Sequence, residues 1–398
     1  MADRIRTRNR LSQWLHLLRR HWSRFGVGIG AIALMAIAGC AVPQVSAEDR
    51  LFLNATVEVL DVATLPPQTF DGTPVGGLSA LAYDRQRSQF YALSDDRGTQ
   101  APPRVYTLNL GITSGEDPKI GAIAVTDVTL LRDTSGEPYP PNQLDPEGMA
   151  LSPRDSLFIS SEGVPSAGSP PLLNEYDRAT GQLRTVLRLP DRYLPDDPSQ
   201  PTQGIRTNLG LESLTLSPTG GGEFEPFRLF TATESALAQD YDDDPANSLT
   251  GRLLHYLIGP NQSTLISEHA YPLELEPLGS VVNGLTALVA LDAGGHFLAL
   301  ERAYGLGGFA VKLFQLASGP ATDTSTLAEL PRPLDGITPI QKQLLLDLSP
   351  LDPRPDNLEG MTLGPPLRGG GTSLWLISDD NFAETQTTQI WLLRLRIA

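Results

Sequence analysis

The segments DNLEGMTLGP (356–365) and SLWLISDDNF (373–382) show the pattern that decides the fold. Two short apolar runs joined by a turn are typical of a pair of antiparallel strands. The same unit occurs four more times, as GGLSALAYD (76–84) with SQFYALSDD (88–96), DPEGMALSP (145–153) with SLFISSEG (156–163), GLESLTLSP (210–218) with RLFTATES (228–235), and NGLTALVALD (283–292) with HFLALERA (296–303). A repeat that spans most of the chain predicts a ring or an array of equivalent units.

Further apolar runs extend each unit beyond two strands. The first unit continues with strand-like runs at 104–110 and 123–130, and the third with runs at 253–258 and 265–271. Four antiparallel strands per unit are typical of a propeller blade. We therefore expect an all-β fold, a β-propeller with five recognisable four-stranded blades. A sixth, degenerate blade remains open within residues 315–348.

The last unit is one strand short. After Phe382 it has a single further strand-like run, residues 388–397, before the sequence stops. The run FLNATVEVL (52–60) lies outside the repeat and is also strand-like. We expect this N-terminal strand to complete the last blade and close the ring, since closure removes an exposed sheet edge.

Residues 1–39 have the composition of an export signal. Seven arginines and one aspartate precede an apolar run that ends in Ile-Ala-Gly-Cys at 37–40. This ending resembles a bacterial lipobox, so Cys40, the single cysteine, is the predicted lipidation site. Cleavage after Ala47 and an uncleaved anchor are the alternatives. The predicted organisation is a signal peptide at 1–39, a short linker at 40–50 and one propeller domain at 51–398.

The charge of the chain limits its partners. The formal net charge is −16, and removal of residues 1–39, which carry +6, leaves −22. We therefore expect no nucleic-acid partner, and membrane contact only through the lipidated N-terminus. The protein is expected to be an exported monomer, either a periplasmic or outer-membrane-anchored lipoprotein or a secreted protein. Its partner would be a small ester substrate or a component of the cell envelope.

Acidic residues recur at two positions of the repeat. The start of strand one and the end of strand two of a blade lie on the same face of a propeller, so both positions should meet at one channel mouth. Aligning the units places Ser79 and Thr286 in the first column beside three glutamates. The acids predicted to bind a metal are Asp95, Glu147, Glu162, Glu212, Glu234, Glu301, Glu359 and Asp379.

Many oxygen ligands with little histidine and no competing cysteine favour Ca²⁺, which takes six to eight oxygens. The alternative is that these acids accept backbone N–H bonds in turns that the repeat copies. Arg97 and Arg302 are candidates for binding an anionic substrate group, although an arginine beside an acid also forms ordinary ion pairs. The chain has no Gly-x-Ser-x-Gly, phosphate-loop or HExxH motif, so its catalytic residues stay unknown.

The phrases DPEGMALSP with ISSEG and DNLEGM with SDDNF resemble the bacterial family labelled esterase-like activity of phytase. The resemblance covers residues 76–397. It implies hydrolysis of an ester or phosphoester bond, and kinship with the β-propeller phytases implies calcium on an acidic face.

Whether the protein is an enzyme stays open at this stage. The leading hypothesis is a phytase-like propeller that cleaves a phosphate or carboxylic ester with calcium at the acidic channel mouth. A non-catalytic, calcium-stabilised binding or scaffold lipoprotein is the main alternative, because a fold alone does not imply chemistry. A lactone or carboxylic esterase with a central calcium is the third.

Overall fold

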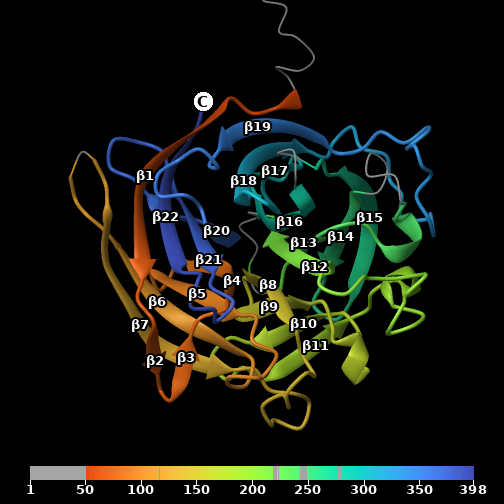
Figure 1. Ribbon diagram of the computed structural model, residues 1–398, viewed down its shortest axis with the longest axis horizontal. Coiled ribbons are helices and arrows are strands. Elements are labelled where there is room, and N and C mark those ends of the chain that lie inside the picture. Colours follow the sequence, from red (N-terminus) through yellow and green to blue (C-terminus); the bar gives the residue numbers. More distant parts are fainter. Residues whose placement is uncertain (1–50, 116, 218–221, 223, 243–248, 276–279) are drawn as a thin grey trace, which may run out of the picture. The chain divides into compact units, whose positions relative to one another are not determined.

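Twenty-two strands and three single-turn 3₁₀ helices make up the computed structural model, which describes residues 51–115, 117–217, 222, 224–242, 249–275 and 280–398. Twenty of the strands form five antiparallel sheets of four strands each. The sheets follow one another around a central axis, as Figure 1 shows. The fold is a five-bladed β-propeller, so the fold class expected from the repeat is confirmed.

The first two blades follow directly from the first two repeat units. Blade 1 is β4 (Leu78–Asp84), β5 (Gln89–Ser94), β6 (Arg104–Ile112) and β7 (Ile120–Leu130). Blade 2 is β8 (Pro146–Leu151), β9 (Ser156–Ser161), β10 (Leu172–Asp177) and β11 (Leu183–Leu187). A hairpin of β2 (Gln68–Phe70) and β3 (Thr73–Val75) precedes blade 1.

The remaining three units form the other half of the ring. Blade 3 is β12 (Leu211–Leu216), β13 (Phe227–Thr233), β14 (Thr250–Ile258) and β15 (Ser263–Pro272). Blade 4 is β16 (Ser280–Ala290), β17 (His296–Gly305), β18 (Gly308–Ala317) and β19 (Gln341–Asp347). Blade 5 is β20 (Asn357–Pro366), β21 (Thr372–Asp379), β22 (Thr388–Ile397) and β1 (Ala55–Leu65).

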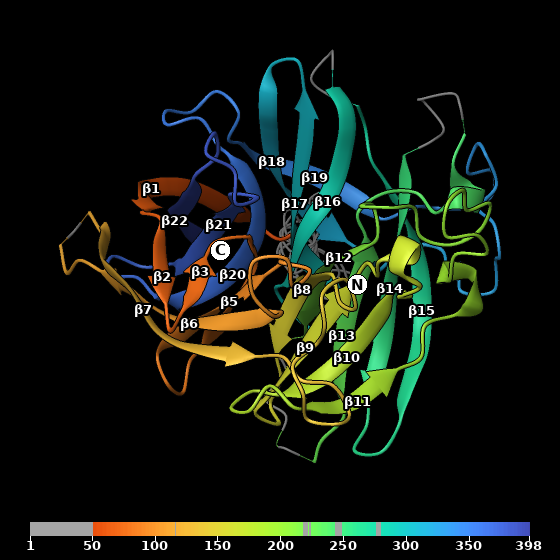
Figure 2. The same cartoon turned by 60° about the horizontal axis from the view of Figure 1, so that its bottom comes forward.

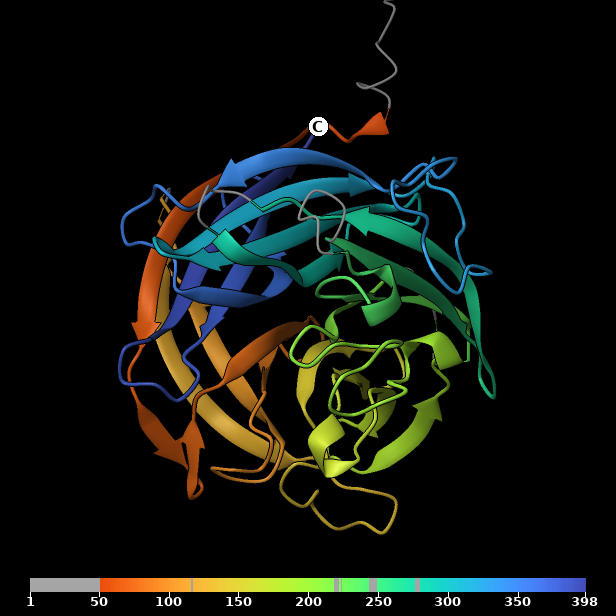
Figure 3. The ribbon, with the colours of Figure 1, turned by 45° about the vertical axis from the view of Figure 1, so that its right-hand side comes forward.

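The N-terminal strand closes the ring. Strand β1 pairs antiparallel with β22, from Ala55 opposite Ile397 to Leu65 opposite Thr388. Figures 1 and 3 show this red strand running along the rim of the ring beside the blue C-terminal strand. The predicted completion of the last blade by the N-terminal segment is therefore confirmed.

A sixth blade does not form. The stretch 315–348, where one was left open, holds the end of β18, a long connection and β19, the outer strand of blade 4. The connection crosses to blade 3, where the buried guanidinium of Arg252 donates to the carbonyl oxygens of Leu327 and Ala328. These two hydrogen bonds anchor the connection to blade 3 without a further sheet.

A separate hydrophobic core lies between each pair of neighbouring blades. Five buried clusters occur, one for each blade interface. Because successive side chains of a strand point to opposite faces, each blade contributes to two of them. In blade 1, Leu81 packs toward blade 5, and Ala80 and Ala82 pack toward blade 2. The rings of Trp375 and Phe90 pack in a T-shaped arrangement across the blade 5 to blade 1 interface, with centroids 5.3 Å apart.

The inner strands β4, β8, β12, β16 and β20 contact one another in sequence around the axis. The narrow space between them, lined by Ser79, Gly148, Ser213, Thr286 and Gly360 among others, holds only about 10 Å³. That is about the space of one water molecule. A cavity above this constriction is therefore closed at its floor.

The described residues contain no helix that is long and apolar enough to cross a membrane. The predicted signal peptide, the lipidation site at Cys40 and the linker lie outside the described residues.

Removal of residues 52–65 is expected to lower the melting temperature strongly, because blade 5 loses its outer strand and β22 becomes an exposed edge. Addition of a synthetic peptide of residues 52–65 should restore the melting temperature, since an extended peptide can add to an open sheet edge. Thermal melts followed by circular dichroism test both effects. A scrambled peptide of the same composition is the control. Equal melting temperatures with and without the segment would contradict the closure.

Candidate functional site

Each blade interrupts its inner strand pair with a β-bulge at the same end of the ring. The register between the first and second strand shifts at this point in all five blades. A bulge leaves a residue without a paired partner and redirects its side chain. The residues at the bulges are the first column of the repeat, Ser79, Glu147, Glu212, Thr286 and Glu359.

The mouth of the ring opens into a cavity of about 970 Å³. Its walls carry carboxylates from four of the five blades, and of the acids that line it only Asp95 and Asp356 are half-buried rather than buried. Seven of the eight acids predicted from the sequence line it, namely Asp95, Glu147, Glu162, Glu212, Glu234, Glu359 and Asp379. The prediction that two acidic columns meet at one mouth therefore agrees with the structure for these seven.

Glu301 does not line this cavity, and Arg302 takes the position expected for it. In each blade, the first-strand residue just before the bulge pairs with a residue of the second strand. In four blades this second-strand residue is a serine or threonine, and the residue that follows it in the sequence is the acid. The four residues are Ser94, Ser161, Thr233 and Ser378. In blade 4 the residue at this place is Glu301, opposite Leu285, so the next residue is Arg302. The sequence alignment is thus displaced by one residue in blade 4.

This displacement moves the Glu301 side chain to the other face of its strand, because strand side chains alternate. Its carboxylate accepts hydrogen bonds from Lys342 Nζ at 2.6 Å and from the Tyr271 hydroxyl at 2.6 Å. It lines a separate small pocket of about 140 Å³ on the side of blade 4. A signal for this placement exists in the sequence, since Leu300 stands where the other units have serine or threonine before the acid.

Glycines make room for the acids of the preceding blade. A Cβ on Gly284 would lie 2.2 Å from Glu234 Oε1, and one on Gly210 would lie 3.0 Å from the Glu162 Cβ. The Gly210 N–H also donates a hydrogen bond to Glu162 Oε1. In blades 3 and 4, the residue two positions ahead of the bulge is therefore a glycine, because a carboxylate of the preceding blade occupies the space that a side chain would need.

Two polar residues that sequence reasoning missed occupy this same position in blades 2 and 5, and of the two Asn357 lines the cavity. Asp145 and Asn357 stand two residues before the bulged Glu147 and Glu359. Asn357 Nδ2 donates to Asp379 Oδ2 at 3.1 Å, and its buried Oδ1 has no partner among the described residues. The polar residue in the phrases DPEG and NLEG was the available signal. Asn208, Arg354, Asp356 and Gln389 also line the cavity and stand outside the repeat columns.

Two arginines predicted to bind substrate lie at the cavity, each beside carboxylates. Arg97 Nε donates to Asp145 Oδ1 at 2.7 Å, and Arg97 Nη2 donates to Asn208 Oδ1 at 2.8 Å. Arg302 Nη2 donates to Glu234 Oε1 at 3.2 Å and to Glu359 Oε1 at 3.0 Å. Burial opposes the charge of Arg302, but these glutamates outweigh it and raise its pKa. The role of Arg97 and Arg302 in binding a substrate stays a prediction.

Burial and mutual repulsion hold most of the cavity acids toward the protonated form. Burial, followed by the nearby Glu212 and Asp145, raises the pKa of Glu147 well above its usual value. Burial and then Asp379 do the same to the pKa of Asp95, and burial and Asp145 to that of Glu162. For Glu359, burial raises the pKa to about 7, and Arg302 limits the rise. The arginines at the cavity therefore do not suffice to hold all of its carboxyl groups in the charged form.

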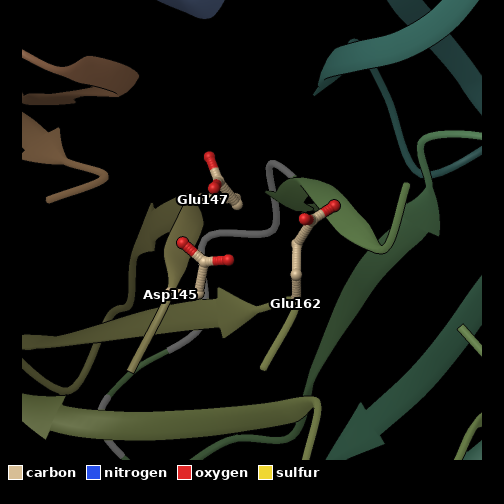
Figure 4. Close-up of side chains that lie close together, drawn as sticks. All are labelled: Asp145, Glu147 and Glu162. Atoms are coloured by element: carbon tan, nitrogen blue, oxygen red, sulfur yellow. The ribbon is translucent and has the colours of Figure 1, made fainter. Parts of the chain in front are cut away.

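Three of these carboxyl groups form a cluster that could hold a cation. One oxygen each from Asp145, Glu147 and Glu162 lies within 4.8 Å of the others, and Figure 4 shows the three groups directed toward a common space. Asp145 Oδ2 is buried and has no hydrogen-bond partner among the described residues. A second cluster joins Glu162 to Glu212 and Glu234. An unpaired buried carboxylate oxygen beside two more acids fits a hard metal ion.

A protein family and several solved structures are similar to this chain. The family model "Phytase-like: Esterase-like activity of phytase" matches residues 73–382. No curated protein matches the chain. Solved structures with a similar course include the endo-arabinase of Bacteroides thetaiotaomicron, at 11% identity and a TM-score of 0.42 over 84% of this chain and 98% of that one. The catalytic domain of the Coprinopsis cinerea α-L-arabinofuranosidase is similar at 9% identity and a TM-score of 0.39, over 86% and 97% of the two chains.

Metal-free protein is expected to be less stable at about pH 8.5 than at about pH 6.5. An acid whose pKa is raised by folding binds its proton more tightly in the folded state, so stability falls as pH rises from the unfolded value of 4.5 through the folded value, about 7 for Glu359. A loss of at least about 1 kcal/mol, or roughly 2 °C in Tm, is expected. Melts in EDTA at the two pH values measure it. A constant or rising stability over this pH interval would show that folding does not raise the pKa values of these acids.

Proposed function

The chain belongs to the phytase-like family described by its esterase-like activity of phytase, and we propose that it is a calcium-dependent hydrolase that cleaves a phosphate or carboxylic ester in the acidic cavity. The observation that carries the proposal is the cluster of Asp145, Glu147 and Glu162 with the unpaired, buried oxygen of Asp145. Net hydrolysis would add the hydroxyl of water to the acid part of the ester and a proton to its alcohol part.

Calcium is the proposed ion because of the donor set. The charged and amide side chains that line the cavity are carboxylates, amides and arginines, and no histidine or cysteine lies among its described lining residues. Oxygen donors in number suit Ca²⁺ better than Zn²⁺. When bound, calcium would supply the positive charge that offsets the acids and attracts the oxygens of an anionic or polarised ester.

The residues of the chain would supply the remaining functions. Asp145, Glu147 and Glu162 would hold the ion, and Arg97 would keep Asp145 in place through its 2.7 Å bond. Glu359 is the candidate for proton transfer, because its pKa of about 7 lets it accept and release a proton near neutral pH. The constriction below the cavity, with space for about one water, would keep the reacting group at the mouth.

Hydrolysis of p-nitrophenyl phosphate, p-nitrophenyl acetate and phytate with calcium and with EDTA tests the proposal. We expect turnover of at least one ester with calcium and its loss in EDTA. Calcium binding with a raised melting temperature but no turnover of any ester would contradict the hydrolase and favour the non-catalytic binding or scaffold protein.

The substitution Glu162→Gln is expected to weaken calcium binding at least tenfold, about 1.4 kcal/mol. The amide keeps an oxygen that accepts from Gly210 N–H but removes one charge shared by both acidic clusters. Glu301→Gln is the matched control, since Glu301 lies outside the cavity. The calcium affinity of this variant should equal that of the unsubstituted protein. Calorimetry measures both. Equal affinities for the two variants would contradict the assigned ligands.

A further inference from the structure

Blade 4 carries an extension that borders the cavity. Figure 2 shows β16, β17 and β18 reaching beyond the rest of the ring as an arm. At its base Val282 pairs with Tyr304, and Tyr304 pairs with Phe309 on the next strand. Paired residues on neighbouring strands point to the same face. The three side chains form a continuous apolar strip, and all three line the cavity.

Because side chains alternate between the two faces of a strand, this strip lies on the same face of β17 as the charged part of the cavity. Arg302 and Tyr304 are two residues apart on β17 and both line the cavity, whereas Glu301 and Ala303 line the pocket on the opposite face. The rings of Tyr304 and Phe309 lie 5.0 Å apart between centroids, at 46° to each other. Tyr304 is 47% exposed, so much of its surface is available to a ligand. The carboxylate side of the cavity therefore has an aromatic wall beside it.

A single arginine of the cavity is not committed to a carboxylate. Arg97 and Arg302 are held by Asp145 and by Glu234 with Glu359. Arg354, in the connection between β19 and β20, is exposed and lines the same cavity. Its guanidinium forms no ion pair or hydrogen bond within the described part of the chain. It is therefore available for one oxyanion, for which a guanidinium is suited.

We propose that the substrate carries one oxyanion, bound by Arg354, and one flat apolar group, packed on the strip of Val282, Tyr304 and Phe309. An aryl phosphate monoester has this chemistry. A densely charged polyphosphate does not fit, because three arginines and eight carboxylates line the cavity and two of the arginines are already paired. The substrate class rests on the proposed hydrolase, whereas the binding site stands on the residues themselves.

Binding of non-hydrolysable ligands to the calcium-loaded protein tests the site without any turnover. Phenylphosphonate is expected to bind about tenfold more tightly than methylphosphonate, because the ring buries apolar area on the strip. Inositol hexasulfate, a mimic of a polyanionic ester, should bind no more tightly than methylphosphonate. Calorimetry gives all three affinities. Equal binding of the two phosphonates, or tightest binding of the hexasulfate, would overturn the proposal.

Two substitutions separate the two halves of the site. Tyr304→Ala should abolish the preference for phenylphosphonate and leave methylphosphonate binding unchanged, and Arg354→Gln should weaken both phosphonates about tenfold. Leu306→Ala, at the fully exposed tip of the same arm, and Arg368→Gln are the matched controls and should change neither affinity. Folding is checked by the melting temperature of each variant. Control variants that weaken binding as much as Tyr304→Ala and Arg354→Gln would contradict the assigned residues.

The outcomes also separate this inference from the proposed function. Selective phenylphosphonate binding that depends on Tyr304 and Arg354 supports the site even if no ester is cleaved, and the hydrolase would then be wrong. Calcium-dependent cleavage of phytate in preference to aryl phosphates would support the hydrolase and overturn the substrate class.

Discussion

The pairing of β1 with β22 is the constraint on which the rest of this structure depends. Each blade buries its two faces against its neighbours, so a ring with one incomplete blade would expose a sheet edge and weaken two of the five interblade cores. The same closure fixes the positions of the five inner strands. Because the bulges lie on these strands, closure also fixes the distances between carboxylates that are far apart in the chain.

That closure forces like charges together. Six of the eight cavity acids are buried to 8% exposure or less, and the rigid strand ends hold them near one another. Burial and repulsion raise their pKa values, so the folded state must either keep protons there or gain a cation. A glutamate side chain on a flexible loop would turn into solvent. Here glycines such as Gly284 admit the carboxylate into a space that a Cβ would occupy, so the charge stays inside.

Blade 4 departs from the other four blades in two related ways. It presents Arg302 where they present an acid, and its strands continue beyond the mouth as the arm. The arginine satisfies Glu234 and Glu359 from within the chain, whereas Asp145, Glu147 and Glu162 on the blade 2 side include an oxygen without a partner. The ring is therefore asymmetric, with one arc neutralised by the protein and another that fits a metal. The apolar strip lies on the neutralised side, through its place two residues along β17 from Arg302.

The repeat alone predicted five recognisable blades, with a sixth left open, as well as seven of the eight acids of the columns and the strand that closes the ring. The period of a blade and the alternation of its strands are local properties of the sequence. It also contained unused signals, namely the residue before each acid and the polar residue two positions before the bulge in blades 2 and 5. The exchange of Glu301 for Arg302 was missed because loop lengths differ between units, so the columns could not be aligned by counting. Only the tertiary structure decided the pairing of Arg302 with Glu234 and Glu359 and the placement of Arg354 at the cavity, since these contacts join residues that meet only after the ring has closed.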